Sequence, residues 1–180
     1  MRKRLLSQKI EKALNAQMTR EADAAQFYLS VGSWAEVQGF EGIATFLYGH
    51  VQEERGHMMK LLKFINQRGG HGKVEPLAKA PADPKTLKEL FEWVLTHEME
   101  NSRQINAIVD MCLREKDYPT FNFLQWFVAE QLEEEALATK LLDKMSVIGE
   151  DKGNKGGLYE FDQDIAGMHD AEQSRGADPS

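Results

Sequence analysis

The sequence predicts an all-α protein: a four-helix bundle with one long crossover connection and a short fifth helix at the C-terminus. Apolar residues recur at steps of three and four over four stretches of nearly equal length. The breaks between these stretches are short, long and short in turn. Two helical hairpins joined by one crossover have this order of connections, whereas an up-up-down-down bundle needs two long ones. A chain of 180 residues suits a single domain of this kind.

The first two predicted helices form one hairpin. The first covers residues 7–37 and ends at the break Gln38-Gly39-Phe40, and the second covers residues 41–68. Residues 69–85 hold repeated glycine and proline breaks and few apolar repeats. They are therefore predicted to form the long crossover.

The second hairpin begins at a capping signal. Residues 86–89 (TLKE) have the form of a capping box and start a third helix, which runs to residue 115. Residues 117–119 (DYP) predict a tight turn with proline at the first helical position, and a fourth helix continues to residue 148.

The C-terminal segment is predicted to be less regular. Residues 150–157 form a polar, glycine-rich hinge, and a short fifth helix over 158–168 has Leu158, Phe161 and Ile165 on one face. The predicted domain therefore covers residues 1–168, and residues 169–180 are expected to form a flexible polar tail.

Composition and charge exclude several classes of protein. The longest stretches without a charge have 12 residues, well short of the roughly 20 that cross a bilayer, so no membrane association is expected. The net charge of −7 makes nucleic acid a poor partner and favours cations. The basic N-terminus has no apolar signal core, and the single Cys112 can form no internal disulfide, so we expect a cytoplasmic protein.

Each of the four long helices has one carboxylate on its predicted buried face. The four residues are Glu21, Glu54, Glu98 and Glu134. All lie close to the midpoints of their helices, so they are predicted to meet in one layer at mid-bundle. His57 follows Glu54 by one turn, and Gln131 precedes Glu134 by one turn.

Buried carboxylates need compensation, because one unpaired carboxylate in a core costs several kcal/mol. No Lys or Arg lies on these faces. The carboxylates are therefore either protonated or bound to cations, and only cations also explain His57 and Gln131. Two divalent ions neutralise four carboxylates, and this ligand set favours iron or manganese over a structural zinc site.

The residues next to this layer each have two possible interpretations. Three acidic residues lie beside the stripe positions: Glu53, Glu130 and Glu133. They form either an accessory metal site or a solvated acidic face. Tyr28, two turns beyond Glu21, is either an electron or proton donor or a core aromatic. No chemistry is assigned to three other side chains: His50, Trp126 and His97.

Four motifs are similar to those of a known family. They are residues 117–135 (DYPTFNFLQWFVAEQLEEE), residues 40–42 (FEG), residues 52–54 (QEE) with His57, and residues 96–98 (THE). Over residues 7–168 the sequence resembles the bacterial non-haem ferritins. The resemblance implies a ferritin-like fold, an iron store with ferroxidase activity, and a homo-oligomeric shell of 24 subunits with Fe(II) and dioxygen as substrates.

The resemblance also implies a role for each site residue. The first iron is bound by Glu21, Glu54 and His57, and the second by Glu54, Glu98 and Glu134, with Gln131 close to dioxygen. A third iron matches Glu53, Glu130, Glu133 and Glu134. Tyr28 matches the tyrosine near the centre.

Haem is not expected. Bacterioferritins resemble a design with Glu-x-x-His on two helices and methionine after the first such glutamate, whereas this chain has Gln131-x-x-Glu134 and Arg55. Two other functions stay open on the sequence alone. One is a monomeric or dimeric di-iron oxidase or peroxidase, and the other is a structural cage subunit without catalytic activity.

Overall fold

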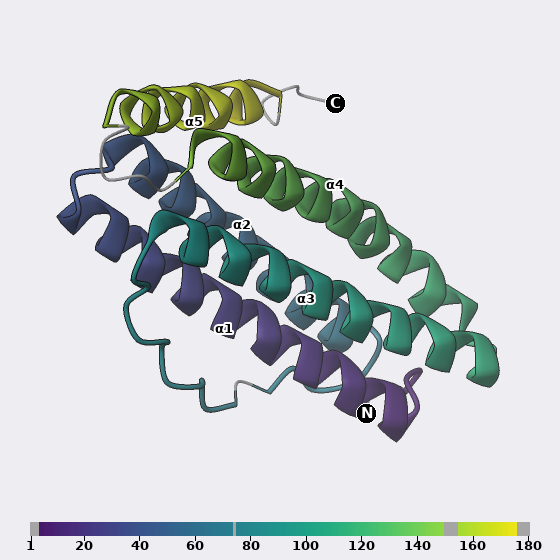
Figure 1. Ribbon diagram of the computed structural model, residues 1–180. Coiled ribbons are helices and arrows are strands. Elements are labelled where there is room, and N and C mark those ends of the chain that lie inside the picture. Colours follow the sequence, from purple (N-terminus) through teal and green to yellow (C-terminus); the bar gives the residue numbers. More distant parts are fainter. Residues whose placement is uncertain (1–3, 74, 150–154, 176–180) are drawn as a thin grey trace.

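The computed structural model describes residues 4–73, 75–149 and 155–175, with side chains described up to Met168. This part of the chain forms five helices: α1 (Gln8–Val37), α2 (Glu41–Gln67), α3 (Leu87–Glu115), α4 (Tyr118–Ile148) and α5 (Lys155–Arg175). The first four lie lengthwise beside one another, and α5 lies across one end of the bundle (Figure 1). The predicted four-helix bundle is confirmed, and its helices begin and end within one residue of the predicted bounds.

The helix starts follow the local sequence. Ser7 Oγ accepts a hydrogen bond from the backbone N–H of Ile10, and Thr86 Oγ1 accepts one from that of Glu89. Asp117 Oδ1 accepts in the same way from Thr120 at the start of α4. Each side chain therefore satisfies a backbone donor that has no partner within its helix.

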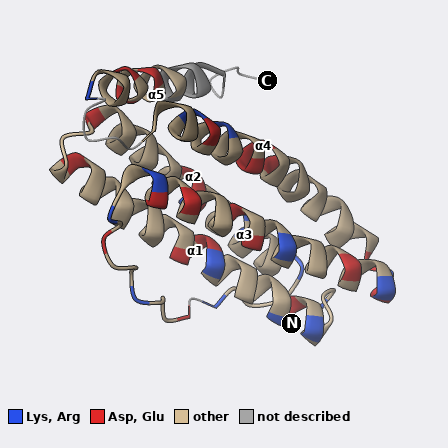
Figure 2. Cartoon of the chain, in the orientation of Figure 1, with Lys and Arg blue, Asp and Glu red and all other residues tan. Residues whose placement is uncertain are grey.

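Two apolar clusters fill the bundle, one toward each end. The cluster nearer α5 includes Tyr28, Phe46 and Phe91, and the other includes Leu14, Leu61 and Ile105. Along every bundle helix, the mid-helix polar residues lie between the segments that form these two clusters. Asp and Glu positions accordingly occur near the middle of the four bundle helices (Figure 2). The core is therefore interrupted by a polar layer, as the sequence predicts.

The crossover between α2 and α3 runs the length of the bundle beside α1 (Figure 1). The backbone N–H of Ala78 donates to Asp23 Oδ1 at 2.8 Å, and Gln26 Nε2 donates to the Ala78 carbonyl at 2.8 Å. Asn15 of α1 bonds in a similar way to the backbone of His71 and Lys73. These bonds fix a segment that has little apolar sequence of its own.

Helix α5 is longer than predicted at both ends. It begins at Lys155 and continues to Arg175, so residues 169–175, expected in the tail, are helical. The prediction was wrong because polar residues such as Glu, Gln and Arg were taken as a sign of a loose tail, although they have favourable helix propensity. Residues 150–154 of the predicted hinge and residues 176–180 of the predicted tail lie outside the described residues.

The packing of α5 on α2 gives α2 its N-terminal cap. Phe40 at the N-cap position makes no side-chain cap, and Asp162 of α5 accepts from the backbone N–H groups of Gly42 and Ile43 instead. Phe161 and Ile165 are buried beside this contact, as predicted. A Cβ atom on Gly42 would lie 2.0 Å from the Asp162 carbonyl oxygen, so the two helices approach closely only because this residue is glycine.

Within the described residues, no helix has both the length and the apolar character needed to cross a membrane.

Candidate metal centre

The predicted layer of carboxylates exists at mid-bundle. Glu21, Glu54 and Glu98 are almost completely buried, each on a different helix. The side chain of Glu134 retains 14% of its exposure, so the layer is closed on three helices and partly open at α4. Among the described residues, two groups of side chains could each hold a metal ion: one contains Glu21 and Glu54, the other contains Glu134, and Glu98 belongs to neither.

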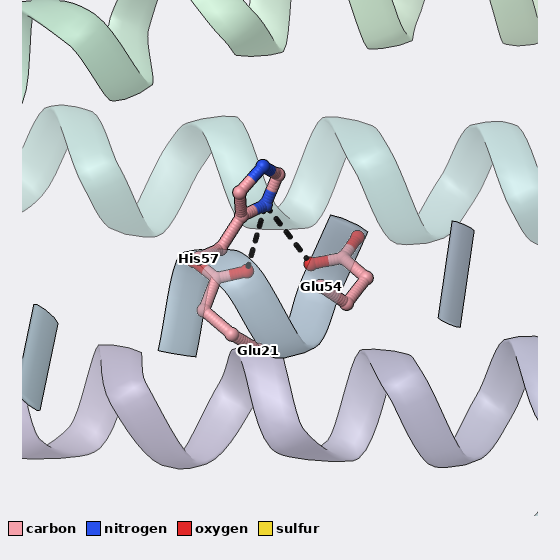
Figure 3. Close-up of side chains that lie close together, drawn as sticks. All are labelled: Glu21, Glu54 and His57. Carbon is pink, nitrogen blue, oxygen red and sulfur yellow. Dashed lines mark hydrogen bonds and ion pairs between the residues drawn. The ribbon is translucent and has the colours of Figure 1, made fainter. Parts of the chain in front are cut away.

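The first group consists of Glu21, Glu54 and His57. Their ligand atoms lie within 4.8 Å of one another, and all three side chains are buried. His57 Nδ1 lies 3.3 Å from Glu54 Oε2 and 4.0 Å from Glu21 Oε2 (Figure 3). Glu54 and His57 share a face because they lie one turn apart on α2, and Glu21 meets them from α1.

Both carboxylate oxygens of Glu98 accept hydrogen bonds from neutral side chains. The Tyr28 hydroxyl donates to Oε1, and Gln131 Nε2 donates to Oε2 at 3.1 Å. Gln131 Nε2 also contacts the Glu98 backbone carbonyl at 3.2 Å. Tyr28 and Gln131, which the sequence places near the centre, are therefore in direct contact with one of its proposed ligands.

The second group consists of His50, Glu53 and Glu134. His50 Nε2 lies 3.4 Å from Glu134 Oε2, and His50 Nδ1 lies 3.7 Å from Glu53 Oε2. The other two acidic residues predicted for an accessory site, Glu130 and Glu133, belong to neither group. Glu130 nevertheless lies near enough to the other carboxylates to be affected by their charges. Burial raises its pKa most, the charges of Glu134, Glu133 and Glu53 raise it further, and His57 acts in the opposite direction.

The buried carboxylates of the layer perturb one another. Burial, and then the charge of Glu54, raises the pKa of Glu21 well above its usual value. Burial and the charge of Glu98 raise the pKa of Glu54 to about 8. Burial also acts against ionisation of Glu98, but nearby His97, together with hydrogen bonds from Tyr28 and Gln131, outweighs it and lowers the pKa. Without a cation the layer therefore resists full ionisation, and a cation would relieve that resistance.

Sequence reasoning missed two amides that are hydrogen-bonded to the candidate ligands. Gln17 Nε2 donates to Glu21 Oε1 at 2.7 Å and to Asn101 Oδ1 at 2.6 Å. Asn101 Nδ2 in turn donates to Gln131 Oε1 at 3.2 Å and lies 3.4 Å from Glu21 Oε2. Asn101 lies three residues after Glu98 on the predicted buried face, which was a usable signal. Gln17 lies off that face, and only its spacing of four residues before Glu21 pointed to it.

Two histidines without an assigned role also lie beside the layer. His50 belongs to the second group, and His97 Nδ1 lies 3.8 Å from Glu98 Oε1. Trp126, to which no chemistry was assigned, packs edge-on against His57 with ring centroids 5.3 Å apart.

We expect the variant Asn101→Leu to weaken metal binding. It removes a donor to both Glu21 and Gln131 at nearly constant volume, and loss of such an orienting contact typically costs 10- to 100-fold in metal affinity or activity. Anaerobic Co²⁺ titration followed by absorbance measures the affinity, with thermal unfolding as the control for folding. A normal melting temperature together with unchanged affinity would show that Asn101 does not orient the ligands.

Comparison with known proteins assigns the chain to a family. The family model described as Ferritin-like domain matches residues 11–148. The chain belongs to the ferritin family. It is 41% identical over 161 residues to a bacterial non-heme ferritin of Campylobacter jejuni, covering 89% of this chain and 95% of that protein. It is 40% identical over 164 residues to a probable bacterial non-heme ferritin-like protein of Haemophilus influenzae, covering 91% and 98%.

Solved ferritin structures have the same fold as this ferritin chain. An open-pore ferritin from Archaeoglobus fulgidus superposes with a TM-score of 0.86 at 37% identity, covering 89% of this chain and 96% of that one. A ferritin from Chlorobium tepidum superposes with a TM-score of 0.79 at 39% identity, with the same two coverages. The resemblance predicted from the motifs is confirmed.

Proposed function

We propose that this protein stores iron and oxidises Fe(II) with dioxygen at a centre within each subunit. The observation that best supports this function is the buried group of Glu21, Glu54 and His57 in the same layer as Glu98 and Glu134. Membership of the ferritin family supports it independently.

Two Fe(II) ions are the substrates at this centre. Glu21, Glu54 and His57 bind the first, and Glu54, Glu98 and Glu134 bind the second, so that Glu54 is shared. Each ion loses one electron, and dioxygen takes both electrons and two protons to give hydrogen peroxide. Carboxylate oxygens favour Fe(III) over Fe(II) and so assist the oxidation. A second position without imidazole lets the product ion leave for storage.

The neutral groups around Glu98 have separate roles. Gln131 is hydrogen-bonded to Glu98 and Asn101, and its amide is the group proposed to donate to bound dioxygen. The Tyr28 hydroxyl bonds to Glu98 and is placed to supply a proton or an electron to the centre. Burial, and then the charge of Glu98, raises the pKa of Tyr28 well above its usual value, so the phenol is protonated at neutral pH.

An accessory site next to the centre accepts a third iron ion. Its residues are Glu53, Glu130, Glu133 and Glu134. Glu53 and Glu133 are exposed, and Glu130 and Glu134 are half-buried, so these carboxylates connect the buried layer with the surface of the bundle. The mutual influence of their charges on Glu130 supports a common cation site.

The storage compartment is a hollow shell of 24 copies of this chain, which holds the Fe(III) mineral. The fold shared with known ferritins supports this assembly. We place the protein in the cytoplasm, which fits its single, buried and unpaired Cys112.

Two measurements separate this function from its two alternatives. Size-exclusion chromatography with light scattering distinguishes a shell from a monomeric or dimeric oxidase. Oxygen uptake on addition of Fe(II) to the metal-free protein distinguishes a ferroxidase from a catalytically silent cage subunit. We expect a shell that consumes oxygen. A monomer, or a shell that leaves the oxygen level unchanged, would contradict the proposal.

The protein is expected to bind no haem. Arg55 follows Glu54 where a bacterioferritin-like site needs a thioether, and a guanidinium cannot replace that ligand. Purified protein should therefore show no Soret band, even after incubation with haem. A stoichiometric complex with the spectrum of methionine ligation would refute this prediction.

A further inference from the structure

Trp126 of α4 lies against a proposed iron ligand, although the proposed reaction gives it no role. Its indole meets the His57 ring edge-on with ring centroids 5.3 Å apart, and it packs on Phe127 with centroids 4.9 Å apart. The side chain is 37% exposed, so it lies between the buried centre and the surface. An indole in contact with an iron ligand is within reach of oxidation by the peroxide that the centre forms.

A lysine of α2 covers the face of this indole. Lys60 lies one turn after His57, and its Nζ is 3.2 Å from the centroid of the Trp126 ring. Two residues on one face of α2 therefore contact the same indole, His57 edge-on and Lys60 over the ring. Burial lowers the pKa of Lys60, and the charge of Glu130 opposes this and favours the ammonium form.

A cation over an aromatic face makes the ring harder to oxidise. The negative face of the neutral indole attracts the ammonium. An indole that has lost an electron carries a positive charge and repels the ammonium at the same distance. Oxidation of Trp126 therefore replaces an attraction with a repulsion, and Lys60 disfavours it.

We propose that Lys60 protects Trp126 from oxidation during turnover, so that the aromatic ring packed on His57 is not consumed by the reaction beside it. The inference rests on the proposed function for its oxidant, the hydrogen peroxide formed at the centre. Lys60 acts through Trp126 and touches no iron ligand itself in this account.

The reaction that Lys60 opposes begins with loss of one electron from Trp126, whose indole proton goes to solvent. Hydrogen peroxide takes this electron, one electron from Fe(II) and two protons, and gives two water molecules. The indolyl radical then forms a C–O bond to dioxygen. The resulting peroxyl group takes one electron from Fe(II) and one proton, and the residue is left as a hydroperoxide.

Two variants separate the charge of Lys60 from its bulk. Lys60→Met keeps an unbranched side chain without the charge, and Lys60→Arg keeps the charge. Repeated additions of Fe(II) in air, followed by peptide mass spectrometry, measure the oxygen added to Trp126. The internal references are Trp34 and Trp93, which are half-buried against the apolar cluster nearer α5.

Oxidation of Trp126 should rise in Lys60→Met and stay at the unmodified level in Lys60→Arg. Two unit charges about 4 Å apart repel enough in water to shift an equilibrium about fivefold, so the yield should rise by about threefold or more. The control Lys63→Met removes an exposed charge one turn further along α2 and should change nothing.

The same comparison on metal-free protein uses azide radicals from pulse radiolysis, which take one electron from an indole without iron. The same order of variants is expected. Equal oxidation of Trp126 in the unmodified protein and Lys60→Met would overturn the proposal, as would oxidation of Lys60→Arg at the level of Lys60→Met. An unoxidised Trp126 in Lys60→Met after Fe(II) and dioxygen have been consumed would also overturn it. Protection from azide radicals without oxygen uptake on adding Fe(II) would instead contradict the proposed function, and with it the role in turnover.

Discussion

The variant Glu54→Ala is expected to lose rapid Fe(II) oxidation while the shell stays assembled. Glu54 is the one side chain proposed to bind both iron ions, and it is buried in one group with Glu21 and His57. Substitution of a residue that only orients a ligand already lowers metal affinity or activity by about 10- to 100-fold. Loss of a shared ligand should therefore slow the initial phase of Fe(II) oxidation by about 100-fold or more. Stopped-flow absorbance after mixing with Fe(II) in air measures that phase.

The matched control is Glu92→Ala, which removes an exposed carboxylate of α3 that pairs with Lys88 outside the layer. It should retain the full initial rate. A fast phase of normal amplitude in Glu54→Ala would mean that the layer is not the site of oxidation.

The raised pKa of Glu54 also predicts how the stability of the metal-free protein depends on pH. The pKa of Glu54 is raised in the folded state, to about 8, above its value in the unfolded chain. A carboxyl group with a raised folded-state pKa favours folding below its unfolded pKa, and this contribution is lost as the pH rises through the folded value. The stability of the metal-free protein should therefore fall as the pH rises from about 4.5, the ordinary pKa of this carboxyl group, to about 8. Thermal unfolding in a chelator should show a smaller fall for Glu54→Ala.

The variant Gly42→Ala is expected to displace α5. The new Cβ would lie 2.0 Å from the Asp162 carbonyl oxygen and 3.2 Å from Ala166 Cβ, and a backbone carbonyl cannot move aside as a flexible side chain can. Relief of the clash separates the helices, exposes Phe161 and Ile165 and removes the cap of α2. Overpacking of this kind typically costs about 1–3 kcal/mol. Limited proteolysis within α5, together with denaturant unfolding, measures both consequences.

Gly167→Ala is the control for this prediction. A Cβ at Gly167 meets no atom within 4 Å, although the residue lies in α5, the helix that Gly42 contacts. It should be neutral or slightly stabilising, because alanine has the better helix propensity. Equal protection of α5 in both variants would show that the close approach at Gly42 does not hold α5 in place.

The bundle could be predicted from the sequence because its signals are local and repeated. Regular apolar steps define each buried face, and capping residues such as Ser7, Thr86 and Asp117 mark the helix starts. The same stripes located Glu21, Glu54 and Glu98, because a carboxylate on a buried face is conspicuous. Helix α5 was underestimated because polar composition conceals a helix that docks through few apolar residues.

The rest of the site could not be predicted because it depends on contacts between helices. Gln17 lies off the apolar stripe, and its role becomes visible only when Asn101 of α3 is placed beside it. His50 lies on the stripe but reads as an ordinary core residue until Glu134 of α4 is found opposite it. Periodicity predicts which face of a helix is buried. It does not predict which side chains of the other helices contact that face.

The central claim is that the buried layer binds two iron ions that share Glu54. Crystals of the metal-free protein soaked in Fe(II) without oxygen, with anomalous diffraction recorded at the iron edge, test it most directly. We predict two iron peaks in each subunit, one at Glu21, Glu54 and His57 and one between Glu54, Glu98 and Glu134. A layer without iron, or iron bound only to the exposed carboxylates outside it, would contradict the claim.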